Sequence, residues 1–434
     1  MKVAVIGSGA AGCSAAYTLR KHGHEVHLFE ASDSIGGRTK QVNKEGFNLP
    51  SGALFLMEGL YPRASGLIEE MGHSQDLIPW AGDTQLVDKD DSRYPVNLVK
   101  MPSYLSIPVL SFGDKVRLAV AGVRILLTPG PKNPFDGGQL GQYDKGENME
   151  DWSRKNLGDR AYDYIINPMM NFLTAAPSRE LATGFPLSMM KKALSMKLSV
   201  PPGGMGQISD WFIEKSPGVE IHFSSTVEKV EANGSGYQVF ANDVSHDVDA
   251  VIVATEAFTA AEILKSCVPD SAVQRLLNVP YGKYATVSIG YQNNPWPDFP
   301  ADLVLPVGDD LNINCLLLNS RRQPGSVPEG GELATVIFNV AGLPALSDED
   351  IKREALEAVT QVFGAAPEPL FVHLFCYERG VSIPGPGLSG SLDGLHQELP
   401  KGICVAGDYF ASASVETAVS TGETAALKLH NSLA

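Results

Sequence analysis

Residues 1–30 of the chain read MKVAVIGSGAAGCSAAYTLRKHGHEVHLFE. A short β-branched run leads into Gly7, Gly9 and Gly12, a helical pattern follows, and a second apolar run ends at Glu30. This order of strand, glycine turn, helix, strand and acid is typical of the βαβ unit that binds a dinucleotide. We therefore expect a nucleotide site at the beginning of the chain.

The positions of these residues predict their roles. Gly7 permits the tight turn, Gly9 lets a pyrophosphate approach the backbone, and Gly12 lets the helix and strand pack closely. The helix N-terminus presents unpaired N–H groups and a positive dipole end to the phosphates. Glu30 can accept hydrogen bonds from ribose hydroxyls, and an acid there disfavours a 2′-phosphate, so NADP is not expected. The predicted contacts of this segment are Gly7, Gly9, Ala10, Ala11, Gly12, Glu30 and Ala31.

Two segments that follow favour FAD over NAD. Gly36-Gly37-Arg38-Thr39 comes soon after Glu30, and a glycine pair beside an arginine suits close contact with a long diphosphate. Taken alone, the glycine pair would indicate only a turn. Pro50-Ser51-Gly52-Ala53 then offers a small-residue backbone surface against which a flat ring could rest.

The end of the chain predicts the other half of the same site. A buried-strand pattern at 403–406 leads to Gly407-Asp408, and Val415-Glu416-Thr417 opens a helix. This geometry receives anions, so Asp408 could bond a ribityl hydroxyl and the helix N–H groups could face a reduced flavin. The alternative is one more βα unit with Asp408 as a helix N-cap. Strand patterns at 218–254 belong to the same domain, with Val227 near the adenine.

Bulk composition limits the function classes. A chain of 434 residues is too long for one ordinary core, so two interleaved domains are expected. The net charge of −16 argues against a nucleic-acid partner. Five scattered cysteines without a C-x-x-C pair indicate thiols in a reducing compartment, and the nine histidines show no metal-ligand spacing. We expect a cytoplasmic protein without a metal site, either a monomer or a homodimer.

The motifs together resemble the flavin amine oxidase superfamily, and most of all its protoporphyrinogen oxidase and carotenoid (phytoene) desaturase branches. The resemblance runs nearly from end to end and is strongest at the termini. It implies an α/β fold, with a Rossmann-type FAD-binding domain of the GR2-like kind and an interleaved α+β substrate domain. The predicted FAD-binding domain comprises 1–80, 200–260 and 385–434, and the substrate domain comprises 81–199 and 261–384.

Departures from the family pattern concern the substrate pocket. Amine-oxidising members carry a lysine that reaches the flavin through a water, and the strand register places Thr286 there, with Lys283 offset and Tyr281 nearby. These three residues are the pocket candidates, and no catalytic base is assigned. Ser414 stands where the amine oxidases have a cage tyrosine. No cysteine lies between Gly380 and Pro400, where covalently flavinylated members attach the ring, so FAD is expected to be non-covalent.

The helical stripe at 112–127, within an apolar stretch at 105–128, allows two interpretations. We favour a helix that faces the core of the substrate domain; the alternative is an interfacial helix in peripheral contact with a membrane. The function that the resemblance implies is FAD-dependent hydride removal from an apolar, conjugating small molecule. The rivals are a flavin amine or amino-acid oxidase and a flavin-binding regulatory protein without catalysis.

Overall fold

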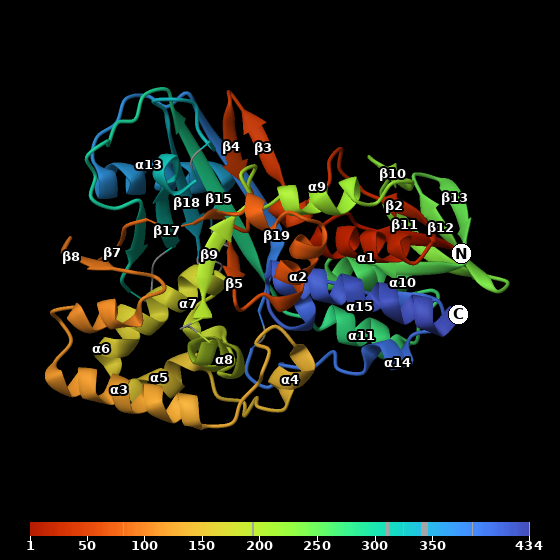
Figure 1. The fold of residues 1–434 in the computed structure, drawn as a ribbon, viewed down its shortest axis with the longest axis horizontal. Helices are drawn as coiled ribbons and strands as arrows, with labels where there is room; N and C mark the ends of the chain where they lie inside the picture. Colours follow the sequence, from red (N-terminus) through yellow and green to blue (C-terminus); the bar gives the residue numbers. More distant parts are fainter. Residues whose placement is uncertain are drawn as a thin grey trace.

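The computed structural model describes residues 1–80, 82–192, 195–308, 312–323, 325–339, 346–383 and 385–433. Its elements form two layered regions that share one boundary (Figure 1). One region contains a parallel sheet between helices, and the other contains a large mostly antiparallel sheet with helices on both faces. The α/β fold expected from the sequence is confirmed.

The parallel sheet brings together strands from the two ends and the middle of the chain. All four of its pairings are parallel. Their residues are mostly β-branched and buried, as expected for strands covered on both faces. In spatial order the strands are β10 (Val219–His222), β2 (Glu25–Phe29), β1 (Lys2–Ile6), β14 (Ala250–Val253) and β20 (Ile403–Val405).

Helices and a small meander cover the two faces of this sheet. Helices α1 (Ala10–Lys21) and α15 (Val415–Leu433) lie side by side on one face, so the first and last helices of the chain are neighbours (Figure 1). The other face packs against the meander and a helix pair. These are β11 (Val227–Asn233), β12 (Gly236–Ala241), β13 (Val244–Val248), α10 (Ala257–Leu264) and α11 (Asp270–Leu277).

The second sheet is antiparallel except where β16 pairs with β7. Helix α13 (Asp348–Phe363) covers one face, and a group of helices covers the other. The strand order is β19 (Phe371–Ser382), β15 (Tyr281–Tyr291), β18 (Glu332–Phe338), β17 (Ile313–Leu318), β16 (Leu303–Pro306), β7 (Thr84–Val87) and β8 (Arg93–Val96). The helices include α3 (Phe112–Leu127), α5 (Met149–Leu157), α7 (Asn167–Thr174) and α8 (Gly184–Lys192).

Short elements join the two regions. The hairpin of β3 (Gln41–Lys44) and β4 (Phe47–Pro50) and a small sheet of β5 (Leu56–Glu58), β9 (Lys197–Val200) and β6 (Ile78–Pro79) belong to this group. The remaining helices are α2 (Pro62–Glu70), α4 (Gly137–Gly141), α6 (Asp159–Ala161), α9 (Gln207–Glu214), α12 (Asn319–Arg322) and α14 (Leu395–Glu398).

The helix pair α10 and α11 bears on the division into domains. A boundary at residue 260 falls inside α10, and α11 packs with α10 against the meander of the nucleotide region. The first strand of the second sheet after this pair is β15, which begins at Tyr281. The predicted boundaries at 81 and 384 fall on residues outside those described.

Helix α3 corrects the preferred interpretation of the 112–127 stripe. The large apolar side chains of the stripe face solvent, and Phe112 is 83% exposed. Only Ala121 and Ile125 of this helix are buried, because the helix packs through its opposite, narrower face. The prediction of a core-facing helix is therefore wrong. Within the described residues, no helix is both long and apolar enough to cross a bilayer.

Candidate functional site

The glycine turn after β1 positions the beginning of α1. Gly7 has φ +96°, a conformation that side chains disfavour. A Cβ on Gly12 would lie 1.8 Å from the Gly7 carbonyl oxygen, so only glycine allows this helix–strand contact. A Cβ on Gly9 would meet nothing within 4 Å. Gly9 therefore borders open space, and a ligand can approach its backbone there.

Glu30 ends β2 beside this turn, and four hydrogen bonds hold its carboxylate. One oxygen accepts from the Ser8 backbone at 2.9 Å and hydroxyl at 2.6 Å, and the other accepts from the Ser32 backbone and hydroxyl. Burial opposes ionisation, but these hydrogen bonds outweigh it and lower the pKa of Glu30. The ionised acceptor required by a ribose diol is present.

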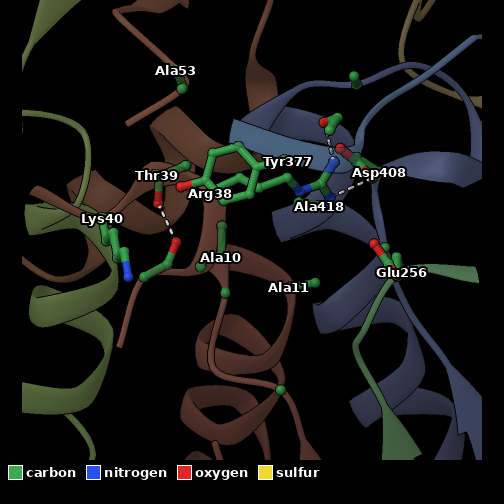
Figure 2. Close-up of a pocket in the computed structure, with 18 of the residues that line it drawn as sticks. Ala10, Ala11, Arg38, Thr39, Lys40, Ala53, Glu256, Tyr377, Asp408 and Ala418 are labelled. Carbon is green, nitrogen blue, oxygen red and sulfur yellow. Dashed lines mark hydrogen bonds and ion pairs between the residues drawn. The ribbon is translucent and has the colours of Figure 1, made fainter. Parts of the chain in front are cut away.

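Arg38 links the two ends of the chain. Its guanidinium donates to Asp408 Oδ1 at 2.9 Å and to the Gly380 carbonyl at 2.8 Å (Figure 2). Burial alone would lower the pKa of Arg38, but the Asp408 carboxylate outweighs that effect and raises it. Gly36 N donates to Ser8 O at 2.9 Å, which holds the Gly36–Thr39 turn against the first turn. The pairing places a fixed cation next to the small-residue loops.

Residues 50–53 include some that line the cavity and some that lie behind its wall. Gly52 and Ala53 line the cavity, and a Cβ on Gly52 would lie 2.3 Å from the Arg38 carbonyl oxygen. Ser51 instead turns inward and donates to the Lys40 carbonyl at 2.7 Å. Pro50 ends β4 and is not among the lining residues.

The side chains of the first turn of α15 have structural roles, while the predicted contact of its backbone N–H groups with the flavin stays a prediction. The Glu416 side chain is fully buried and accepts from the backbone N–H groups of Arg63 and Ala64, so it caps α2. Thr417 is fully buried against Ser414, which accepts from its backbone N–H at 3.1 Å. Neither residue lines the cavity, whereas Val415 does.

A cavity of about 710 Å³ lies between the two regions. One end, which we call the nucleotide end, is formed by Gly7, Gly9, Glu30, Ser225 and Val227. The cavity runs from there past Arg38 and Asp408 to the second sheet. Among the predicted cofactor contacts, those that line it are Gly7, Gly9, Ala10, Ala11, Glu30, Ala31, Gly36, Gly37, Arg38, Thr39, Gly52, Ala53, Val227, Gly407, Asp408 and Val415.

The far end, which we call the aromatic end, was largely missed from the sequence. It is formed by Phe55, Phe172, Tyr284, Ile337 and Tyr377. Tyr284 of β15 and Tyr377 of β19 are cross-strand partners. Tyr377 lies in the middle of the close-up of the cavity (Figure 2). Burial raises the pKa of both tyrosines, so their hydroxyls stay protonated. The register of this strand pair was the signal that could have identified them.

The three pocket candidates lie outside the cavity lining. Lys283 pairs with Glu378 at 3.2 Å, and the Tyr281 hydroxyl accepts from the Ala257 backbone at 3.0 Å, at the beginning of α10. Thr286 lies two residues after Tyr284, fully buried between strands. The pairing of β15 with β19 shifts register between Gly282 and Tyr284. The first residues of β15 therefore do not follow the side-chain alternation of the residues after Tyr284. None of the three residues lines this cavity, and their role in the substrate pocket stays a prediction.

One family of known proteins matches nearly the whole chain. Residues 10–430 match the family described as flavin containing amine oxidoreductase. The chain belongs to this family. It is therefore a flavin-dependent oxidoreductase, and FAD is its cofactor. The glycine turn, Glu30 and the Arg38–Asp408 pair fit the adenosine, pyrophosphate and ribityl parts of that group.

Individual relatives match this flavoprotein over only part of the sequence, or share its fold at low sequence identity. It is 33% identical over 177 residues to a zeta-carotene desaturase of Capsicum annuum, covering 37% of this chain and 29% of that one. It is 25% identical over 223 residues to protoporphyrinogen oxidase 2 of Arabidopsis thaliana, covering 50% and 37% of the chains. The matches thus span well under half of these relatives. Cyclohexylamine oxidase of Brevibacterium oxydans shares the fold, with TM-score 0.74, 20% identity and coverage of 100% and 99%.

Proposed function

We propose that this flavoprotein oxidises an apolar, conjugating small molecule of the porphyrinogen or polyene class. Hydride would leave a carbon or nitrogen of the substrate and pass to N5 of the flavin, and a second hydrogen would leave as a proton. When bound, FAD supplies the hydride acceptor. The chain supplies the binding surface, the exclusion of water and the fixed charges around the cofactor.

The proposal rests on one observation: each carboxylate that lines the cavity already has a cationic or hydrogen-bonding partner. Asp408 pairs with Arg38, Glu256 with Arg379 and Glu378 with Lys283, while Glu30 is held by two serines. Among the described lining residues, no carboxylate is left to neutralise a cationic substrate. The surface offered at the aromatic end is Phe55, Phe172, Leu173 and Ile337. Such a surface favours an uncharged, flat or extended donor.

The two tyrosines of the aromatic end would orient the donor. The Tyr284 hydroxyl donates to the Gly52 carbonyl at 3.3 Å, so its ring is tied to the loop beside Ala53. The Tyr377 hydroxyl is buried, and no described residue forms a hydrogen bond with it. A buried hydroxyl of this kind is costly unless something bonds it. The Tyr377 hydroxyl is therefore available to bond a polar atom of the cofactor or the donor.

An anaerobic titration of the flavin absorption band tests the proposal. The purified holoprotein is mixed separately with a porphyrinogen, a polyene and an amine, with oxygen excluded so that reduced flavin accumulates. We expect bleaching by the porphyrinogen or the polyene and none by the amine. Bleaching by the amine alone would contradict the proposal. Bleaching by dithionite but by none of the three would favour a flavin-binding protein without catalysis of this kind.

An amine oxidase is the second candidate, and one observation favours it. Tyr284 and Tyr377 provide an aromatic pair at the cavity despite the serine at position 414. Aromatic faces attract cations, so the pair could hold an ammonium group. The amine arm of the titration decides between the candidates, and Tyr377→Leu should remove amine-driven bleaching if this candidate holds.

We also propose that the exposed face of α3 contacts a membrane surface peripherally. Phe112, Val116, Val120, Val123 and Leu127 form this face, and all are exposed. Lys115, Arg117 and Arg124 lie on the same helix. Exposed apolar side chains with basic neighbours are typical of interfacial helices that bind anionic lipid. An apolar substrate could be drawn from such a surface.

Sedimentation with vesicles of phosphatidylcholine and phosphatidylglycerol tests this contact. We expect the unaltered holoprotein to sediment with the vesicles and a Val120→Glu, Val123→Glu double variant to remain in the supernatant. Leu370→Glu is the matched control, because Leu370 is 51% exposed and lies outside α3. Equal sedimentation of all three proteins, or of none, would contradict the proposal.

A further inference from the structure

Two histidines far apart in sequence meet at the edge of the parallel sheet. His27 lies on β2 and His222 on β10, and Glu220 is the direct strand partner of His27. His27 is buried with only 8% of its side chain exposed, whereas the Glu220 side chain is 62% exposed. Among the described residues, these are the only three metal-ligating side chains whose donor atoms all lie within 4.8 Å of one another.

The two ring nitrogens lie close to each other and to the Glu220 carboxylate. His27 Nδ1 lies 3.1 Å from His222 Nε2 and 3.5 Å from Glu220 Oε2, and His222 Nε2 lies 3.4 Å from Glu220 Oε1. Zn²⁺ bonds of about 2.0–2.1 Å in a tetrahedron separate neighbouring ligands by about 3.3–3.4 Å. A hydrogen bond between the two rings would explain the first distance alone. It does not explain why each ring nitrogen also lies near a different oxygen of one carboxylate, an arrangement that would let both rings and Glu220 bind one ion.

A second carboxylate orients the buried ring. His27 Nε2 lies 3.0 Å from Glu25 Oε1. A carboxylate accepts, so Nε2 carries the proton and Nδ1 keeps its lone pair for a ligand. Metal-binding histidines usually donate their other N–H in this way. The Glu25 and Glu220 carboxylates bring negative charge to the cluster, and Lys2 and the N-terminal amino group lie near it.

We propose that His27, Glu220 and His222 form a binding site for Zn²⁺ or a similar borderline divalent cation, with solvent as the fourth ligand. Two histidines and one glutamate are a common zinc ligand set. The ion would tie the edge strand β10 to β2. His222 also stacks on Phe29 with a centroid distance of 4.6 Å, and its carbonyl accepts from the Glu30 backbone at 2.9 Å. The site therefore lies directly behind the nucleotide end of the cavity, but it shares no residue with the lining.

Calorimetric titration with ZnCl₂ tests the site, using tag-free holoprotein stripped with a chelator. We expect one Zn²⁺ per chain, with affinity lowered more than about tenfold by His222→Gln and by Glu220→Gln. Glu220 is exposed, so its substitution leaves the fold intact, which an unchanged flavin spectrum verifies. His430→Gln is the control, because His24 and His430 also have ring nitrogens 3.1 Å apart.

Each outcome of the Zn²⁺ titration either supports or overturns the proposed site. Retained binding in His430→Gln, together with the losses above, supports the site. Failure of the unaltered protein to bind Zn²⁺ would overturn the proposal. Binding by both His222→Gln and Glu220→Gln with unaltered affinity would place the ion elsewhere and overturn it as well.

Discussion

Gly12 sets the separation of α1 from β1 and thereby the position of the helix N-terminus at the cavity. An added methyl group would lie 1.8 Å from the Gly7 carbonyl oxygen, which is backbone and cannot move aside cheaply. We expect Gly12→Ala to lower the free energy of unfolding by about 1–3 kcal/mol and to reduce bound flavin. Urea unfolding and the ratio of flavin to protein absorbance measure the two effects.

Gly122 of α3 provides the control for that substitution. It is also helical, and an added Cβ would meet nothing within 4 Å. Gly122→Ala should stabilise the protein slightly because alanine has the higher helix propensity. Equal losses in both variants would show that helix propensity, rather than the contact with Gly7, determines the effect.

His396 predicts a dependence of stability on pH. Burial lowers the pKa of His396 from 6.5 to about 4, although the Val405 carbonyl accepts a bond from its ring at 2.8 Å. Above pH 6.5 the ring is neutral in both the folded and the unfolded chain. As the pH falls from 6.5 to 4, the unfolded chain gains a proton that the folded chain does not, so stability is lost.

The comparison with His396→Gln isolates this effect from the other titrating groups. Between pH 7 and pH 4.5, urea unfolding should show a loss in the unaltered protein larger by about 2–3 kcal/mol than in the variant. The same loss in both proteins would contradict the assignment.

At the residue scale, the sequence predicts the cofactor contacts better than the substrate contacts. Gly7, Gly12 and Glu30 carry local signals, because a turn, a close approach and a strand end each require a particular residue type. Tyr284 and Tyr377 carry none, since aromatic residues occur throughout buried strands. They become a pair only through the cross-strand register of β15 and β19.

Among the elements, α2 and α15 are joined by one buried carboxylate. Glu416 accepts from two N–H groups in the first turn of α2, which have no helical partner. We expect Glu416→Ala to lower the free energy of unfolding by about 1–3 kcal/mol, because it leaves buried donors unpaired. Chemical denaturation measures the change.

Glu423 of the same helix is the matched control. It pairs with the partly exposed Arg63 side chain instead of with backbone groups. Glu423→Ala should cost less than Glu416→Ala, because the Arg63 side chain is partly exposed and water can replace its lost partner. A larger loss for Glu423→Ala than for Glu416→Ala would contradict the capping role.

Element types followed from the sequence more readily than their orientation. The buried strands β1, β14 and β20 appear as apolar β-branched runs, as parallel strands covered on both faces should. The stripe of α3 correctly predicted a helix, but periodicity does not say whether an apolar face meets a core or a surface. Its opposite face, through Ala121 and Ile125, makes the buried contacts.

At the scale of the whole molecule, the attachment of the flavin remains a prediction. Cys376 lines the cavity, but burial raises the pKa of its thiol, which disfavours the reactive thiolate. We expect precipitation with acid to leave a colourless protein pellet and all of the flavin in the supernatant. Yellow colour that stays with the washed pellet would show a covalent bond, and Cys376→Ser would then test its position.

The overall architecture was predictable because the glycine turn and the C-terminal Gly407-Asp408 specify two halves of one site. The domain limits stay a prediction; α10 and α11, which pack with the nucleotide region by tertiary contact, carry no distinguishing sequence signal. The meeting of His27 and His222 was equally hidden, because it depends on the neighbouring positions of β2 and β10 in the sheet.

We propose above all that the aromatic end of the cavity receives an apolar donor beside the flavin. Phe172 is the side chain to change, because it lines this end and its ring centroid lies 5.6 Å from that of Phe55. Phe172→Asp adds a charge to the apolar surface, while Phe172→Leu keeps it apolar and serves as the control.

The decisive measurement is the rate of anaerobic flavin bleaching by the donor that bleaches the unaltered protein. We predict that Phe172→Asp retains its flavin and that bleaching slows by at least about tenfold, while Phe172→Leu changes the rate far less. An unchanged rate in a flavin-replete Phe172→Asp protein would contradict the claim.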